Sequence, residues 1–277
     1  MSLDYIFDGD ELGKLASRYA EQYVSARPFP HVVIDDFLPR DVLEKVLDEF
    51  PEPNDIEWVR YEREGYEKHK MESKVEGDLP SFTRFLLYQF NSSPFLKFLE
   101  ALTGIDGLIP DPYFSGGGLH QVGNGGYLKI HADFSLHPTF GISRRINVLV
   151  YLNKDWQDSY GGQLELWNSD MSSCEARVLP IFNRCVIFNT TVDSFHGHPD
   201  PITCPENVTR RSIALYYYAK EDPEDRVRST TEFMFRPDEK PVVNIRAQAS
   251  RFIPPIILDT RRRLLDYLKT RNGRRHS

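Results

Sequence analysis

The sequence predicts a mainly β protein with flanking helices, an α+β fold, and three observations support this prediction. Short segments rich in β-branched and aromatic residues recur at near-regular spacing in the central part of the chain, with turn residues between them. Apolar residues at helical spacing dominate the N-terminal third. The 277 residues are 40% hydrophobic, which allows one substantial core or at most two small ones.

The N-terminal elements are predicted to support the β-structure. Apolar spacing predicts a helix over 10–26 and another over 39–50, which begins at a proline, and we expect both to pack on the outer face of the larger sheet. A further helical pair is predicted over 81–90 and 94–102, with its phenylalanines in the core. The charged segment 57–77 is typical of a solvated hairpin or a mobile loop.

Five strands are predicted in the central part of the chain. Because these strands follow one another without long helical segments between them, they favour a sandwich or barrel over βαβ units. The first strand follows a glycine-rich stretch, Gly123 to Gly126, which we interpret as a hairpin turn. The predicted strands lie at 127–130, 145–153, 161–167, 184–188 and 212–218.

The triplet at His131 to Asp133 predicts two ligands of a metal site. Side chains two residues apart on a strand point to the same face, so His131 and Asp133 can reach one ion while Ala132 points away. A second histidine from another strand would complete a facial triad of two histidines and one carboxylate. Such a triad leaves coordination positions open and is characteristic of non-haem Fe(II) oxygenases.

Two histidines compete for the third ligand position. His196 and His198 have the same strand parity, so both could face the ion. We choose His196 because His198 directly precedes Pro199 and is expected to lie in the turn already. The remaining candidates, His120 and His137, are predicted to be loop or rim residues.

In this order and spacing, the motifs resemble the catalytic core of the Fe(II)/2-oxoglutarate-dependent dioxygenases, particularly the prolyl-hydroxylase branch. The resemblance covers about residues 113–220, and 29–39 is similar to the opening strand of that family. It implies a double-stranded β-helix (jelly-roll) core over 111–220 and a support region over 1–110 that is continuous with it. Beyond the resemblance, the residue pattern predicts a C-terminal extension over 221–277, with a strand-like piece over 229–236 and a basic terminal helix over 259–270. The matching motifs are His131-x-Asp133, Tyr151 to Trp156, Gly161-Gly162, His196, and Arg210-x-x-Ile213.

The resemblance implies an arginine that binds the far carboxylate of 2-oxoglutarate, and arginine suits this role because its planar fork binds carboxylates in bidentate fashion. Arg210 and Arg211 are both candidates. If Arg210 faces the cavity, so do Ser212, Ala214 and Tyr216, while the apolar alternate residues face the core; we therefore favour Arg210. By the same resemblance, Tyr151 is a candidate second donor to that carboxylate.

The implied function is hydroxylation of an unactivated C–H, on a prolyl residue of a peptide or protein, with release of succinate and CO2. The implied cofactors are Fe(2+), 2-oxoglutarate and O2, with ascorbate as reductant. Asp133 argues against a halogenase, which typically has a small residue in place of the carboxylate. Alternatives are an oxygenase acting on a free amino acid, sugar or natural product, and a catalytically silent jelly-roll binding module. The resemblance further suggests that the segment 57–77 is a lid over the substrate entrance.

The composition is that of a soluble, cytoplasmic enzyme. No stretch approaches the ~20 apolar residues that a membrane-spanning helix needs, and the first residues resemble no signal peptide. A formal net charge of -7 argues against nucleic-acid binding. The 3 cysteines form no metal or disulfide pattern, so free thiols are expected. The oligomeric state is left open.

Overall fold

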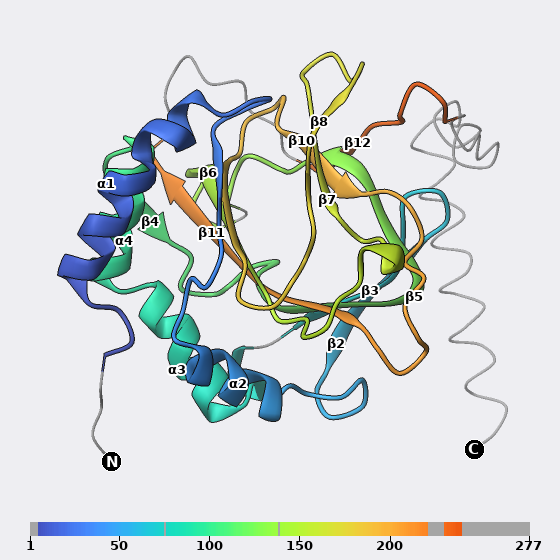
Figure 1. Cartoon of the computed structure of the whole chain (residues 1–277), viewed down its shortest axis with the longest axis horizontal. Coiled ribbons are helices and arrows are strands. Elements are labelled where there is room, and N and C mark those ends of the chain that lie inside the picture. Colours follow the sequence, from blue (N-terminus) through green and yellow to red (C-terminus); the bar gives the residue numbers. More distant parts are fainter. Residues whose placement is uncertain (1–4, 75, 138, 221–229, 240–277) are drawn as a thin grey trace, which may run out of the picture. The chain divides into compact units, whose positions relative to one another are not determined.

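The β-structure is one antiparallel sheet that folds back on itself. The computed structural model describes residues 5–74, 76–137, 139–220 and 230–239, all within one unit that spans residues 1–239. Within that part of the chain, 12 strands join into a nearly closed, jelly-roll-like barrel (Figure 1), in the order β1-β9-β6-β11-β5-β10-β7-β8 with β2, β3, β4 and β12 attached at the sides. The predicted fold class is confirmed.

The predicted strands are all present, and most of their ends shift by a few residues, but β5 begins at Gly118 rather than at residue 127. Strands β2 and β3 form the hairpin that is one of the two alternatives predicted for 57–77, and the short strands β4 and β8 are not predicted. The bounds are β1 (His31–Ile34), β2 (Trp58–Arg63), β3 (Glu67–Ser73), β4 (Ile109–Pro110), β5 (Gly118–Ala132), β6 (Ser143–Tyr151), β7 (Leu164–Trp167), β8 (Cys174–Val178), β9 (Cys185–Asn189), β10 (Phe195–His198), β11 (Arg210–Ala219) and β12 (Glu232–Phe233).

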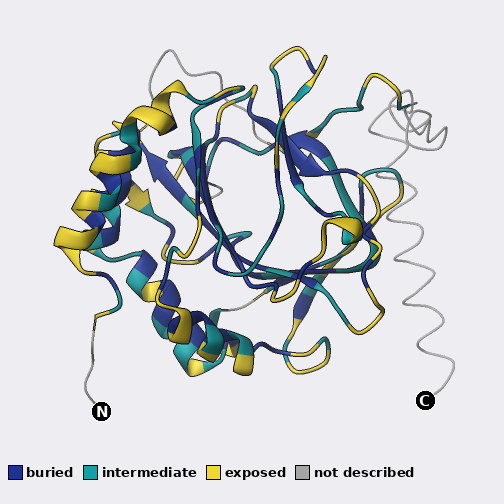
Figure 2. Cartoon of the chain, in the orientation of Figure 1, coloured by how far each residue is buried: buried dark blue, intermediate teal, exposed yellow. Residues whose placement is uncertain are grey.

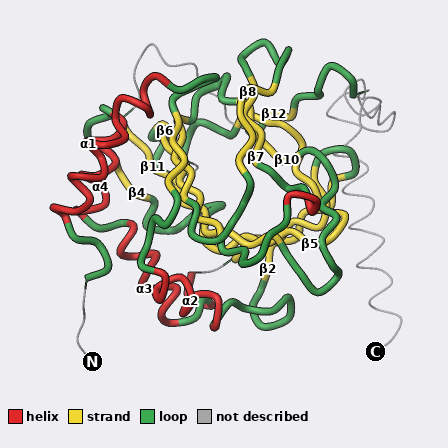
Figure 3. Tube along the Cα trace, in the orientation of Figure 1, coloured by secondary structure: helices red, strands yellow, loops and turns green. Residues whose placement is uncertain are grey.

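The helices lie together on one side of the β-structure (Figure 3). Asp8 caps the first helix by accepting hydrogen bonds from the backbone of Asp10 and Glu11, and Gly104 ends the last one in the left-handed conformation. The bounds are α1 (Gly9–Ser25), α2 (Arg40–Asp48), α3 (Ser81–Phe90) and α4 (Ser93–Thr103), with short 3-10 turns at Glu76–Asp78 and Asp158–Tyr160.

The largest core fills the space between these helices and the sheet, as expected. Their inner faces are buried and their outer faces exposed (Figure 2). Phe90, Phe95 and Phe98 pack against the outward residues of β6 and β11, such as Val148 and Leu215. The described helices include none that is long and apolar enough to cross a bilayer.

Strand β5 corrects the predicted hairpin at Gly123 to Gly126. These residues lie inside one 15-residue strand, where they form a bulge opposite β3, because Lys70 pairs with Val122 while Lys68 pairs with Tyr127. A Cβ on Gly126 would lie only 2.9 Å from the carbonyl oxygen of Lys68, so the close approach requires glycine. The first half of β5 pairs with β11 and the second half with β10. The bulge therefore connects the two layers of the folded sheet, one that contains β11 and one that contains β10.

The alternation predicted for 212–218 is the one observed in β11. Ile213, Leu215 and Tyr217 face the helical core, whereas Ser212 and Tyr216 face a cavity between the two layers of the sheet. This arrangement presents a partly polar wall to the cavity.

Several predictions fall outside the described residues or stay untested. The predicted C-terminal helix over 259–270 lies outside them, and the division at residues 110 and 220 stays a prediction. The strand-like piece expected near residues 229–236 is present as β12, which pairs with β5. All 3 cysteines are free thiols, as expected.

Candidate active site

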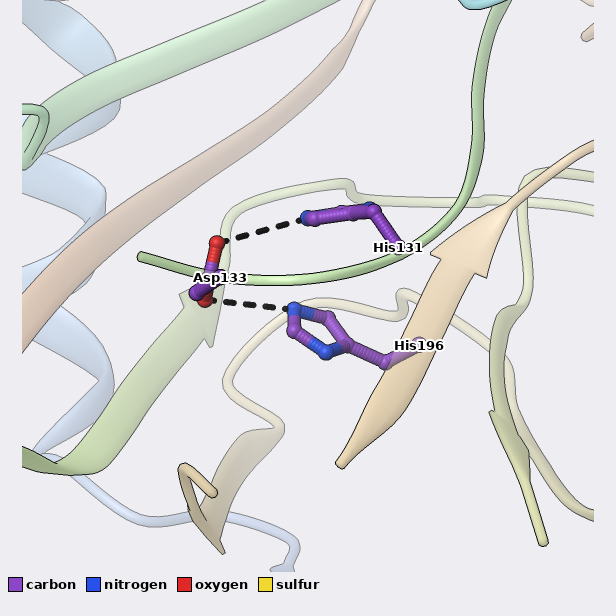
Figure 4. Close-up of side chains that lie close together, drawn as sticks. All are labelled: His131, Asp133 and His196. Carbon is purple, nitrogen blue, oxygen red and sulfur yellow. Dashed lines mark ion pairs between the residues drawn. The ribbon is translucent and has the colours of Figure 1, made fainter. Parts of the chain in front are cut away.

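His131, Asp133 and His196 converge at one point of the cavity (Figure 4). The two histidines are paired residues on β5 and β10, and their ring centroids are 4.5 Å apart. Asp133 follows the end of β5, and its two carboxylate oxygens lie 3.4 Å from His131 Nε2 and 3.5 Å from His196 Nε2. One ligand atom from each residue lies within 4.8 Å of the others, which is the arrangement of a facial triad.

Both imidazoles are oriented by the backbone. His131 Nδ1 is 2.9 Å from the carbonyl oxygen of Lys129, and His196 Nδ1 is 2.8 Å from that of Ser194. This contact places the proton on Nδ1 and leaves Nε2 free to bind a metal. Burial, followed by repulsion from His131, lowers the pKa of His196 to about 4, so this ligand is unprotonated at neutral pH.

Two side chains of β6 hold the Asp133 carboxylate, and the sequence prediction missed both. Asn147 Nδ2 donates to Asp133 Oδ2 at 2.9 Å, and the buried Arg144 guanidinium lies 2.9 Å from the same oxygen. Arg144 also donates to Asn147 Oδ1, which ties the group together. Burial alone would raise the pKa of Asp133, but the positive charge of Arg144 holds it well below its usual value.

His198 lines the same cavity but does not belong to the triad. It pairs with Leu128, and a register irregularity of the β10–β5 ladder between His196 and His198 separates the two histidines despite their equal parity. Gly197 allows this approach, since a Cβ there would lie 2.8 Å from two carbonyl oxygens of β5. Burial, followed by the positive charges of Arg210 and Lys70, holds the pKa of His198 well below its usual value.

Arg210 lines the cavity and Arg211 does not. Arg210 is 6% exposed, donates from Nε to the Gly162 carbonyl at 2.8 Å, and donates from Nη2 to the Tyr151 hydroxyl at 3.1 Å. No carboxylate of the described residues forms an ion pair with it. Arg211 instead lies 3.6 Å from Glu52 outside the cavity.

The Gly161-Gly162 motif lies against this arginine. Both glycines adopt a positive φ, near +70°, and a Cβ on Gly162 would lie 3.1 Å from Arg210 Cδ. The motif therefore gives the arginine both its space and its backbone acceptor. The Tyr151 side chain is fully buried, and burial raises its pKa, so its hydroxyl keeps its proton at neutral pH.

The cavity between the layers has a volume of about 100 Å³ and contains both the triad and Arg210. Lys70 and His120 also line it. The prediction that His120 is a loop or rim residue is wrong, because it lies within β5 and points inward. His137 does lie in a loop, where its buried ring contacts Asp111 at 3.3 Å, and it takes no part in the triad.

A second cavity, of about 200 Å³, also reaches His131 and Asp133. The hairpin of β2 and β3 forms one wall of it, and Phe233 of β12 forms another, with its ring 5.6 Å from that of His131. Segment 57–77 is therefore a hairpin, but one that is only partly solvated: Glu67 and Glu72 are buried. Its role as a lid stays a prediction.

Comparison with known proteins identifies this arrangement. Residues 117–218, which contain the triad and Arg210, match the family model described as the 2OG-Fe(II) oxygenase superfamily. The candidate metal ligands and the buried arginine thus lie inside the matched segment.

Solved structures of prolyl hydroxylases share the fold of this chain. One is a prolyl hydroxylase from Trichoplax adhaerens in complex with a hypoxia inducible factor peptide fragment: it is 18% identical, the match covers 76% of this chain and 91% of that one, and the TM-score is 0.55. Another is a prolyl 4-hydroxylase from Phytophthora capsici, 20% identical over 79% of this chain and 67% of that one, with a TM-score of 0.52. At these identities the likeness concerns the fold.

The residues of the candidate site fit Fe(II) and 2-oxoglutarate. Two imidazoles with free Nε2 atoms and one ionised carboxylate form the donor set of a non-haem Fe(II) site. A buried guanidinium with neutral partners needs an anion, and the far carboxylate of 2-oxoglutarate provides one.

Proposed function

We propose that this oxygenase uses Fe(II), O2 and 2-oxoglutarate to hydroxylate an unactivated C–H, on a prolyl residue of a peptide or protein, with release of succinate and CO2. The observation that carries the proposal is the shared cavity: a buried His-Asp-His triad and a buried arginine without a carboxylate partner among the described residues face the same space. The prolyl substrate is supported by the shared fold of prolyl hydroxylases.

Each group has a defined task in this proposal. His131, Asp133 and His196 would hold the metal, which, when bound, supplies the redox chemistry of oxygen transfer. Arg210 and the Tyr151 hydroxyl would bind the far carboxylate and so fix the orientation of the cosubstrate. The second cavity, which reaches the triad from the side of the β2–β3 hairpin, would receive the substrate.

The first test is succinate formation from 2-oxoglutarate with Fe(II) and ascorbate, which we propose as the reductant. The wild-type chain should turn over 2-oxoglutarate, whereas His131→Ala and Arg210→Ala should lose at least 10-fold in turnover at low 2-oxoglutarate concentration, since each removes a group that binds directly. Arg211→Ala is the matched control and should retain wild-type turnover, because Arg211 faces Glu52 outside the cavity. A wild-type chain that neither binds nor turns over 2-oxoglutarate would refute the proposal.

A second test addresses the substrate. The enzyme would be incubated with a panel of proline-containing peptides and, separately, with free amino acids. Mass spectrometry should detect the gain of one oxygen atom on a prolyl peptide. If a free amino acid gains oxygen and no peptide does, the prolyl-peptide part of the proposal is wrong while the oxygenase assignment stands.

A further inference from the structure

His198 is a buried imidazole that belongs neither to the triad nor to the residues that support it. Its side chain is 5% exposed and lines the cavity that holds the triad and Arg210. The ring forms no hydrogen bond with the described residues, and its Nδ1 is a buried atom without a partner among them. Native proteins seldom bury a polar group without a partner, so a polar ligand atom is expected beside this ring.

The surroundings of His198 indicate what kind of atom that is. After burial, the groups that lower the pKa of His198 most are Arg210 and Lys70, and all three side chains line the same cavity. Lys70 is already paired with Glu72 at 3.5 Å, whereas Arg210 has no carboxylate partner among the described residues. His198 and Arg210 pair with Leu128 and Val122 of β5, on either side of the glycine bulge. An unpaired guanidinium and an N–H donor in one cavity are complementary to a carboxylate.

We propose that His198 is a further binding residue for the cosubstrate, and that one of its ring nitrogens donates a hydrogen bond to the carboxylate that Arg210 binds. This inference rests on the proposed function, because it takes that carboxylate to be the far one of 2-oxoglutarate. His198 is then a positioning residue: it holds the end of the cosubstrate that is remote from the metal, while His196, two residues away, holds the metal itself.

The test compares binding rather than turnover. Under anaerobic conditions, the Fe(II)-loaded protein is titrated with 2-oxoglutarate and, separately, with 2-oxopentanoate, which has the same chain length but ends in a methyl group. Formation of the Fe(II) chelate is followed by its visible absorption. In His198→Leu, affinity for 2-oxoglutarate should fall about 10- to 100-fold, the usual effect of losing a hydrogen bond to a charged group. Affinity for 2-oxopentanoate should stay unchanged.

Two further variants and a control distinguish the loss of this hydrogen bond from misfolding of His198→Leu. His198→Asn and His198→Gln place an amide donor near the positions of Nδ1 and Nε2, and at least one of them should restore most of the affinity for 2-oxoglutarate. His31→Leu, which removes a histidine from the edge strand β1 outside the cavity, should bind both oxo acids like wild type.

Three results would overturn the inference. The affinity of His198→Leu for 2-oxoglutarate could equal that of wild type, it could fall equally for both oxo acids, or the variant could lose Fe(II) itself, which would make His198 a metal ligand. In each case wild-type binding of 2-oxoglutarate leaves the proposed function standing. A wild-type protein that binds no 2-oxoglutarate removes both.

Discussion

The candidate metal ligand Asp133 is held by two residues of strand β6, which follows it in the chain. Asn147 and Arg144 hold one oxygen of its carboxylate, and the other oxygen faces His131. Such outer partners of a metal ligand fix its orientation and commonly change metal affinity 10- to 100-fold.

We expect Asn147→Ala to lower the affinity for Fe(II) by about 10- to 100-fold, because the carboxylate loses the hydrogen bond that orients it. Metal titration followed by calorimetry would measure this change. The control is Asn153→Ala, which removes another buried asparagine whose hydrogen bonds, to Pro180 and Arg211, lie outside the cavity. That variant should lose stability but keep its metal affinity; an equal loss of affinity in both would contradict the orienting role.

For individual residues, the sequence predicts the candidate metal ligands and Arg210 better than the side chains that support them. The alternation of 210–218 places Arg210 inward without any knowledge of the fold. The pairing of Arg144 and Asn147 with Asp133 crosses a loop, and the two residues have opposite parity, so no strand pattern predicts that both reach one oxygen. One signal was available: Asn147 is a polar residue within an otherwise apolar stretch of β6.

Among the strands, β5 contributes most to the geometry of the site, because it pairs with both strands that carry other site residues. Its first half pairs with the strand that carries Arg210 and its second half with the strand that carries His196. The glycine bulge between the two halves of β5 therefore sets the distance between Arg210 and the candidate metal ligands.

We expect Gly126→Ala to destabilise the protein by about 1–3 kcal/mol, the usual cost of overpacking a closely packed site. The new Cβ would meet the carbonyl oxygens of Gly123 and Lys68, at 2.8 and 2.9 Å. Gly123→Ala is the matched control, since nothing lies within 4 Å of its Cβ position, and it should change stability by less than ~0.5 kcal/mol. Urea unfolding measures both; equal stabilities would contradict the role assigned to the bulge.

The elements also show where sequence reasoning stops. Strands with apolar alternation, such as β6 and β11, were predicted nearly to their ends. The short strand β8 was not, because its residues alternate between exposed and partly exposed and carry little apolar signal. Glycine clusters usually form turns, so the sequence predicts a turn at Gly123 to Gly126, and only the pairing of β5 with β3 identifies a bulge.

For the molecule as a whole, three histidines that line the cavity couple stability to pH. Burial lowers the pKa of His120 and of His196 to about 4 and holds that of His198 well below its usual value, so all three stay neutral in the folded protein at neutral pH. In the unfolded chain all three take up protons below about pH 6.5. Their contribution to stability is thus complete above that pH and is lost as the pH falls from about 6.5 towards 4.

The metal-free protein should therefore lose roughly 1 kcal/mol of unfolding free energy per pH unit for each of these histidines over that range. Urea unfolding at pH 7.5, 6 and 5 would measure the loss. His198→Leu has one such group fewer and should show a shallower dependence. A free energy of unfolding that is the same at pH 7.5 and pH 5 would contradict the prediction.

The strand β12 determines how short a recombinant fragment of this protein can be. It pairs with β5, Phe233 covers the ring of His131, and Arg236 and Glu239 form ion pairs with Asp200 and Lys129. The family match ends at residue 218, before Phe233, Arg236 and Glu239. A fragment trimmed to this boundary would retain His131, Asp133 and His196 but would lose the cover that Phe233 gives to His131. Recombinant fragments that keep this cover therefore need to extend at least to residue 239.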